Sequence, residues 1–267
     1  MESQALLSLQ DISDEVVTNL ILPYLTQKDQ SRCLTCSHHM RELSRKGWAS
    51  KDICLPAMSI KLLETFLNYA EDISSIDLSN NTYVTDDHIK LLDKRYLRKL
   101  NVNGCKRITL SSLQDMDLTH LELKRLPIRD EHLAYLETMP LQHLNLDSCR
   151  FVTDVGLSYL SKMHLQHLNL RNLFNITDRG LFHLPATLQH LNLDSCFKIG
   201  DGGLTHLERM NLQHLDLRDT NITDNGLTHL KHMQLQHLNL HDTEVTPSGV
   251  SNLIDFGIDS RNIHFYV

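Results

Sequence analysis

The 267-residue chain is poor in aromatic residues, which make up 6% of it, and has only six cysteines. At that density the cysteines do not suggest the disulfide framework of a small secreted scaffold. Basic residues are outnumbered as well: 26 Lys and Arg stand against 33 Asp and Glu, for a formal net charge of -7. A general binder of phosphate backbones needs a cationic excess. We therefore expect no nucleic-acid partner.

Long apolar runs are missing. No stretch approaches the roughly 18 apolar residues of a membrane helix, and the first residues lack the basic segment of a signal peptide. These absences predict no membrane partner and a cytoplasmic location, with the nucleus as an alternative.

Signals of catalysis are also missing. The sequence has no phosphate-binding glycine loop and no G-x-S-x-G motif. One C-x-x-C pair, Cys33 and Cys36, has no second pair with which to complete a zinc site, so we interpret it as core packing. We expect a protein that is not an enzyme, with no catalytic residues, no cofactor and no metal.

One short phrase recurs through the second half of the chain. LQHLNL stands at 141–146, 165–170, 188–193 and 235–240, and LQHLDL at 212–217, so the spacing is 23 or 24 residues. Looser copies begin at 118, 97 and 73. The period therefore predicts about eight repeats over residues 73–256.

Each repeat resembles the leucine-rich repeat: an L-x-x-L-x-L strand, a turn, and a helix that carries T-D-x-G-L. The resemblance implies an α/β solenoid, a horseshoe arc with parallel strands on the concave face and helices on the convex face. One repeat cannot cover its own leucines, and Leu168 should pack against Leu181 of the following helix and against neighbouring repeats. A charge at Leu168 should therefore unfold several repeats together.

The helix starts carry their own signals. Thr153, Thr177, Thr223 and Thr246 are expected N-caps, and aspartates such as Asp154 follow them near the positive end of the helix dipole. A glycine occupies one early-helix position in successive repeats, as at Gly180, because a side chain there would strike the adjacent repeat.

A small buried residue is expected in the turn after each strand. Three repeats place Cys105, Cys149 and Cys196 there. Alternate repeats should lie ~10 Å apart, which is too far for a disulfide, so we expect free core thiols. This position, together with T-D-x-G-L, resembles the cysteine-containing leucine-rich repeats that are typical of F-box proteins.

Residues 6–50 read as a small helical head. Val17, Ile21, Tyr24 and Leu25 follow amphipathic helix spacing. The pattern resembles an F-box, although Ser13 replaces its usual proline and Gln30 a usual apolar residue. The resemblance implies binding of a Skp-family adaptor through Ile12, Asp14, Glu15, Val16, Ile21, Leu25, Asp29 and Cys36. The alternative is a helical cap that shields the first repeat. Residues 51–72 are expected to form a helical linker or N-terminal cap, and residues 257–267 a C-terminal capping strand.

The polar positions of the strands should face the concave side and form three columns. From the repeat at 141 onward we expect them to bind a protein substrate. These candidate residues are His143, Asn145, Asp147, His167, Asn169, Arg171, His190, Asn192, Asp194, His214, Asp216, Arg218, His237, Asn239 and His241. The third column, which begins at Lys124, alternates in charge and suggests a cross-strand ladder of opposite charges.

Histidines stacked ~4.8 Å apart should repel one another when protonated, which would lower their pKa in the folded state. The first column, which begins at His120, should therefore make the protein less stable below pH ~6.

Together these patterns predict a substrate-recognition adaptor of an SCF-type (cullin-RING) ubiquitin ligase. The head would bind a Skp-family adaptor, and through it the cullin and RING subunits, while the concave face binds an unknown protein. The alternative is a repeat scaffold or inhibitor without a ligase. A bacterial effector that mimics a host F-box protein, and acts in the host cytosol, is a variant of this alternative.

Overall fold

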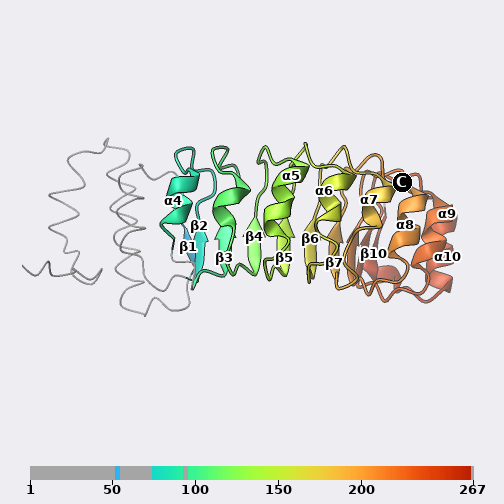
Figure 1. Cartoon of the computed structure of the whole chain (residues 1–267). Coiled ribbons are helices and arrows are strands. Elements are labelled where there is room, and N and C mark those ends of the chain that lie inside the picture. The colour runs from blue at the N-terminus through green and yellow to red at the C-terminus, as the bar shows by residue number, and fades with distance from the viewer. Residues whose placement is uncertain (1–51, 55–73, 93–95, 266–267) are drawn as a thin grey trace, which may run out of the picture.

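The structure is a computed structural model that describes residues 52–54, 74–92 and 96–265. The expected F-box-like head and most of the expected linker lie outside these residues. Within them, ten parallel strands form one sheet, and their order in the sheet is their order in the chain. Figure 1 shows this succession as a row of repeats, each a strand backed by a helix. The predicted leucine-rich-repeat solenoid is confirmed.

The strands are only two or three residues long and hold a strict register. From β2 to β9 the central leucine or isoleucine is buried and pairs with its counterpart in the next of these strands, as Leu144 does with Leu168. From β4 to β9 the flanking residues are partly exposed, so equivalent polar residues line up across the sheet. The strands are β1 (Asp52–Cys54), β2 (Ser75–Asp77), β3 (Lys99–Asn101), β4 (His120–Glu122), β5 (His143–Asn145), β6 (His167–Asn169), β7 (His190–Asn192), β8 (His214–Asp216), β9 (His237–Asn239) and β10 (Ile263–His264).

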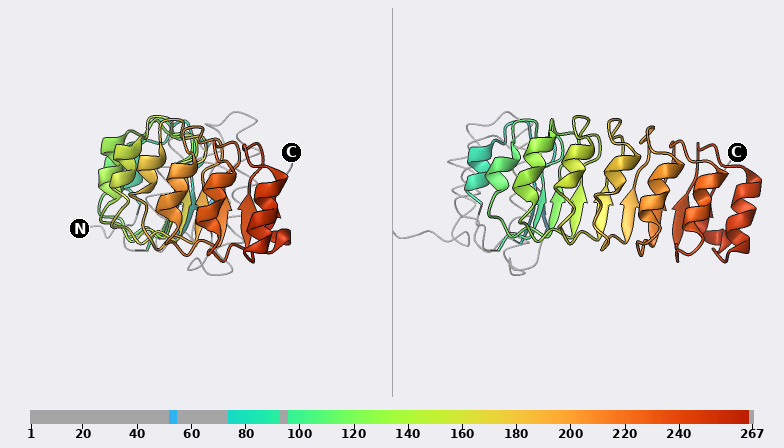
Figure 2. Two further views of the ribbon diagram at one scale, coloured as in Figure 1. Left: turned by 90° about the vertical axis from the view of Figure 1, so that its right-hand side faces the viewer. Right: turned by 45° about the vertical axis from the view of Figure 1, so that its right-hand side comes forward.

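Short helices cover the other face of the sheet, and the turned views in Figure 2 show them on one side along the whole arc. No helix of the described part is long and apolar enough to cross a bilayer. The α-helices are α4 (Asp86–Lys90), α5 (Asp130–Leu133), α6 (Asp154–Ser158), α7 (Asp178–Leu181), α8 (Asp201–Leu207), α9 (Asp224–Leu227) and α10 (Pro247–Asp255). The 3-10 helices are η5 (Leu110–Leu113), η6 (Ala134–Leu136), η7 (Thr228–Leu230) and η8 (Ser260–Asn262).

The core is a continuous apolar column between the strands and the helices. Leu168 of β6 and Leu181 of α7 are at most 2% exposed, and the buried cluster extends from Ile76 to Ile258. Each buried leucine contributes about 1.5–3 kcal/mol of transfer free energy. No repeat closes this column by itself, so the stack is the stable unit.

The turn after each strand has a fixed backbone shape that the sequence analysis did not predict. The residue immediately before the buried turn position adopts a positive φ, for example 62° at Ser148 and 61° at Ser195. The buried cysteine that follows donates its S–H to a carbonyl of the preceding repeat, as from Cys149 Sγ to Leu123 O at 3.1 Å. Cys105, Cys149 and Cys196 are free thiols, as expected. Burial raises their pKa, to about 12 for Cys149 and Cys196.

The T-D pair at each helix start joins neighbouring repeats. Thr177 caps α7, as predicted, and accepts a hydrogen bond from Arg179 N. Its backbone N–H and its hydroxyl both donate to the Asp154 carboxylate of the repeat before, at 2.7 and 2.6 Å. A Cβ at Gly180 would collide with that carboxylate, which explains the glycine. The aspartate therefore bridges repeats in addition to lying near the helix dipole.

The C-terminal segment adds one more strand to the sheet. After α10 and η8, β10 pairs in parallel with β9 and brings His264 opposite Asn239. The N–H of Leu240 donates to the carbonyl of His264 at 2.8 Å. The last full repeat is thus covered by backbone pairing on its outer side.

Candidate functional site

The concave face carries a shallow, open groove over β5 to β9. It lies over the central leucines of β6 to β8, whose side chains are buried, and between the first two polar columns. The lining residues are His143, His167, Leu168, Asn169, His190, Leu191, Asn192, His214, Leu215, Asp216 and His237. The structure thus brings the expected first and second columns together on one surface.

The histidines of the first column stack ring against ring along the whole groove. The ring centroids of His167 and His190 are 4.0 Å apart, those of His190 and His214 4.2 Å, and the neighbours along the column 5.6 to 5.8 Å. His264 of β10 extends the stack, 4.5 Å from His237. Sequence reasoning missed His264 because its segment lacks the repeat phrase.

The histidine stack favours neutral imidazoles. Desolvation, followed by repulsion from His167 and His214, lowers the pKa of His190 to about 4. Desolvation also lowers the pKa of His120, His167 and His237, with smaller contributions from neighbouring histidines. Near neutral pH these rings therefore offer one donor, one acceptor and a π face each, and no positive charge.

The second column is largely engaged in holding the turns. Asn169 Oδ1 accepts a hydrogen bond from the N–H of Arg171 at 3.0 Å, and the same bond recurs from Asp147 N to Asn145 and from Asp194 N to Asn192. An Asn or Asp is needed here because only a short acceptor reaches the backbone two residues on. Asn169 and Asn192 also line the groove.

Glu122 departs from this pattern. Its carboxylate accepts hydrogen bonds from His143 Nε2 at 2.8 Å and from Asn145 Nδ2 at 2.7 Å. Burial alone would raise the pKa of Glu122, but these bonds and one from Asn103 outweigh it and lower the pKa. Asn103 Oδ1 takes over the turn bond by accepting from the N–H of Lys124 at 2.5 Å. Glu122 is thus a negative point at one end of the groove.

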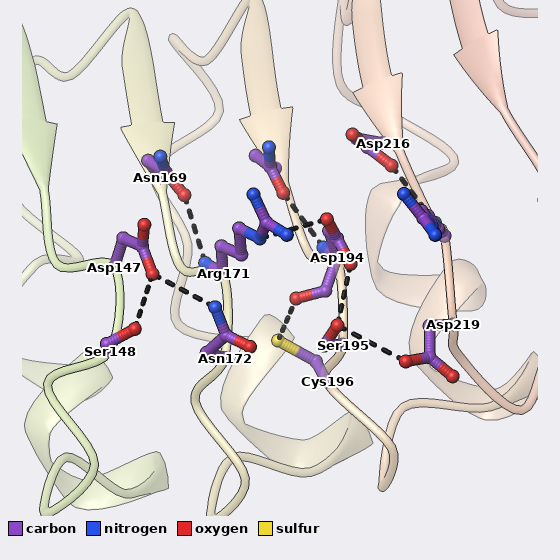
Figure 3. Close-up of polar contacts among 12 residues, drawn as sticks. Asp147, Ser148, Asn169, Arg171, Asn172, Asp194, Ser195, Cys196, Asp216 and Asp219 are labelled. Carbon is purple, nitrogen blue, oxygen red and sulfur yellow. Dashed lines mark hydrogen bonds and ion pairs between the residues drawn. The ribbon is translucent and has the colours of Figure 1, made fainter.

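The third column forms opposite-charge pairs between neighbouring repeats, as the alternation of charge suggests. Lys124 Nζ lies 2.6 Å from Asp147, and Arg171 Nε lies 3.0 Å from Asp194. Arg218 turns to Asp242 of the following repeat, at 3.1 Å, rather than to Asp194. Figure 3 shows Asp147, Arg171 and Asp194 beyond the strand ends, with Arg171 reaching across to Asp194.

Two of the expected binding residues lie below the surface. Asp147 is 3% exposed and Asp194 is 5% exposed. Asp147 also accepts from Ser148 Oγ and from Asn172 Nδ2, so its oxygens are occupied. These carboxylates hold the turn cations in place and do not face a partner.

Two further expectations concerned a metal site and the adaptor-binding residues. Among the residues described, no group of three or more His, Cys, Asp and Glu side chains has the arrangement of a metal site. The expected adaptor-binding positions, Ile12 to Cys36, lie outside the described residues.

Comparison with known proteins agrees with this geometry. Residues 139–161, 185–207 and 210–231 match the family described as "Leucine Rich repeat". No curated protein matches the chain. A chain of the mouse RP105/MD-1 complex is similar at a TM-score of 0.52 and 21% identity, over 78% of this chain and 41% of its own length. A chain of the Rad7 and Elc1 complex in yeast gives a TM-score of 0.43 at 17% identity, over 74% of this chain and 71% of that one.

At these identities the similar structures show the fold alone. The matched repeats and the observed arc define a leucine-rich-repeat scaffold for protein–protein interaction.

Proposed function

We propose that this chain is a protein-binding adaptor whose concave face holds a protein partner. The observation that carries the proposal is the register of the sheet, which aligns His167, His190 and His214 beside Asn169 and Asn192 over an open groove. Such a surface offers area and directional hydrogen bonding but no deep pocket. A folded protein surface or an extended segment suits it better than a small molecule.

The finer proposal is that the chain acts as a substrate-recognition adaptor of an SCF-type ubiquitin ligase. Support comes from the F-box resemblance around Ile21 and Leu25, and from cysteines in the turns of a subtype typical of F-box proteins. In this role the chain acts by positioning a substrate and not by catalysis. The cytosol, with the nucleus as an alternative, is the location that this role implies.

Co-purification tests the adaptor role. The full-length chain is expressed with a Skp-family protein and recovered through a tag on the chain. We expect a stable complex that is lost when Ile21 and Leu25 are both replaced by Asp. His190→Ala, a change in the groove, serves as the matched control and should leave the complex intact. No association at micromolar concentration, or loss in the control as well, would argue against the adaptor role.

A second candidate is a scaffold or inhibitor without a ligase, of which a bacterial effector acting in a host cytosol is one form. The near-verbatim repetition of LQHLNL is the observation that favours it, since such uniformity suggests recent duplication. In this case the groove would still capture a protein, but the Ile21 and Leu25 replacements would change none of its complexes.

A further inference from the structure

A second surface lies along the edge of the arc where the strands turn into the helices. The turns at 102–109, 124–129, 147–153, 171–177 and 194–200 contain eight Lys and Arg but only two acidic residues. Those two are Asp147 and Asp194, which are buried and paired with Lys124 and Arg171. We name the six remaining cations the basic rim: Lys106, Arg107, Arg125, Arg129, Arg150 and Lys198, all exposed.

The structure pairs the cations of the basic rim with no acidic residue of 74–92 or 96–265. Within the described part of the chain, none of the six forms an ion pair. The next two turns toward the C-terminus carry Asp219, Asp242 and Glu244, so the positive charge is confined to the earlier turns. The aspartates nearest to these turns, Asp86, Asp130, Asp154 and Asp178, accept hydrogen bonds from the last turn residues Thr109, Thr153, Thr177 and Gly200 and pair with none of the six cations.

Aromatic rings hold two of these guanidinium groups. The Cζ atom of Arg129 lies 5.1 Å from the ring centre of Phe151, and that of Arg150 lies 5.5 Å from the ring centre of Phe174. Phe174 also stacks on Phe197, with ring centroids 5.4 Å apart and planes inclined by 13°. Phe151 and Phe197 are still 52% and 45% exposed.

This arrangement selects among anionic partners. A guanidinium laid on a ring loses little further freedom when it binds, and its N–H edge fits a carboxylate with two parallel hydrogen bonds. Nucleic-acid binding would instead use free ring faces for the bases. Phe174 is engaged by Arg150 from one neighbouring repeat and by Phe197 from the other, so base stacking there is disfavoured.

We propose that the basic rim docks a carboxylate-rich segment of a protein partner. Its Asp and Glu side chains bind the guanidinium edges of Arg125, Arg129 and Arg150, and its aliphatic atoms lie on the exposed parts of Phe151 and Phe197. The rim is a different surface from the concave groove. The proposal therefore holds whether or not the head binds a Skp-family adaptor.

The test measures binding of a fluorescein-labelled oligoglutamate peptide to the full-length chain by fluorescence anisotropy at low ionic strength. The rim variant carries Arg125→Glu, Arg129→Glu and Arg150→Glu. The matched control carries the same charge change on exposed cations at or beyond the C-terminal ends of the helices: Lys90→Glu, Lys162→Glu and Arg209→Glu. We expect the dissociation constant of the peptide to rise at least about tenfold in the rim variant and less than about twofold in the control. Added salt should weaken binding to the native chain.

A labelled oligothymidylate of similar charge provides the second probe. The proposal is supported if the native chain binds the peptide more tightly than the oligothymidylate and if only the rim variant loses peptide binding. Equal losses in the two variants, no peptide binding at all, or tighter oligothymidylate binding through the same residues would each overturn it. Circular dichroism monitors the fold. If the rim variant unfolds at a lower temperature than the native chain, the double variant Arg129→Gln and Arg150→Gln replaces it, and peptide binding should still be weaker.

Discussion

Gly200→Thr should stabilise the protein by restoring a bond that one repeat lacks. At most described helix starts a threonine N–H and hydroxyl bind the preceding aspartate, as Thr177 binds Asp154 and Thr223 binds Asp201. At α8 the N-cap is Gly200, which offers Asp178 only its N–H, at 2.8 Å, and has no side chain to cap the helix.

The magnitude follows from the local geometry. Gly200 has φ -131°, an extended conformation that threonine adopts freely, and a Cβ there would meet only Asn221 O at 3.4 Å and Asp178 Oδ2 at 4.0 Å. Replacing glycine without strain contributes about 0.4–1 kcal/mol through the unfolded chain. A half-buried hydroxyl bond to a carboxylate adds roughly 1 kcal/mol. We expect a gain of about 1–2 kcal/mol in the free energy of unfolding.

Urea denaturation followed by circular dichroism measures this gain. The same threonine in an Asp178→Ala background should lose the carboxylate part and retain the chain-entropy part, so a double-mutant cycle isolates the bond. Gly203→Ala is the contrasting change, because its Cβ would lie 2.8 Å from Asp178 Oδ1 and should destabilise. An unchanged or lower stability for Gly200→Thr, or no coupling to Asp178, would refute the interpretation of the T-D pair as a bridge between repeats.

Three further predictions concern the histidine column, the carboxylates of the turns and the buried cysteines. The melting temperature should fall as the pH is lowered from 7 toward 4, because the folded-state pKa of His190 is about 4 against an ordinary 6.5; full stability above pH 6.5 is then lost below it. After allowing for the partial exposure of the ring, we expect a loss of roughly 1–2 kcal/mol in the free energy of unfolding. A melting temperature that does not change with pH, both in the native chain and in His190→Gln, would contradict this. Asp147→Ala should cost about 2 kcal/mol, because this buried carboxylate binds Lys124, Ser148 and Asn172. The exposed Asp242→Ala, which breaks only the pair with Arg218, should cost under about 0.5 kcal/mol, and equal costs in a thermal melt would contradict the burial argument. Burial raises the pKa of Cys149 to about 12, so this thiol should react with iodoacetamide only in denaturant. Peptide mass spectrometry measures the labelling, and a labelled Cys149 in the native protein would contradict the prediction.

Most of the fold follows from the period of the sequence, because a buried leucine can be recognised by type and spacing alone. Leu168 and Leu181 are buried as expected, and the threonine caps and free cysteines lie where the repeats predict. The interaction of Asp154 with Thr177 was not predicted, because its partner belongs to the next repeat and the helix dipole already accounts for an acidic residue there. The left-handed turn residues were missed for another reason. Arg125, Ser148 and Asp219 share a backbone conformation but no side-chain chemistry.

The candidate site was predicted in position but not in detail. Strand alternation correctly places the histidine and asparagine columns on one face. It cannot say which charge pairs with which, since Arg171 and Arg218 both adjoin Asp194 in the third column, yet Arg171 pairs with Asp194 and Arg218 with Asp242. Burial of Asp147 and Asp194 depends on the tight turn beneath them, which strand periodicity does not describe.

The residues that repeat and the residues that deviate serve different purposes on this surface. Each second-column asparagine holds the turn that follows it, as Asn145, Asn169 and Asn192 do. The recurrence of asparagine therefore reflects the needs of the stack and identifies no partner. Glu122 breaks that column, and the arc supports the exception with hydrogen bonds from His143, Asn145 and Asn103. A stack of near-identical repeats presents the same chemistry at every step, and a partner finds its register only where the chemistry changes. Recognition should therefore depend more on Glu122 and on the basic rim than on any single histidine of the groove.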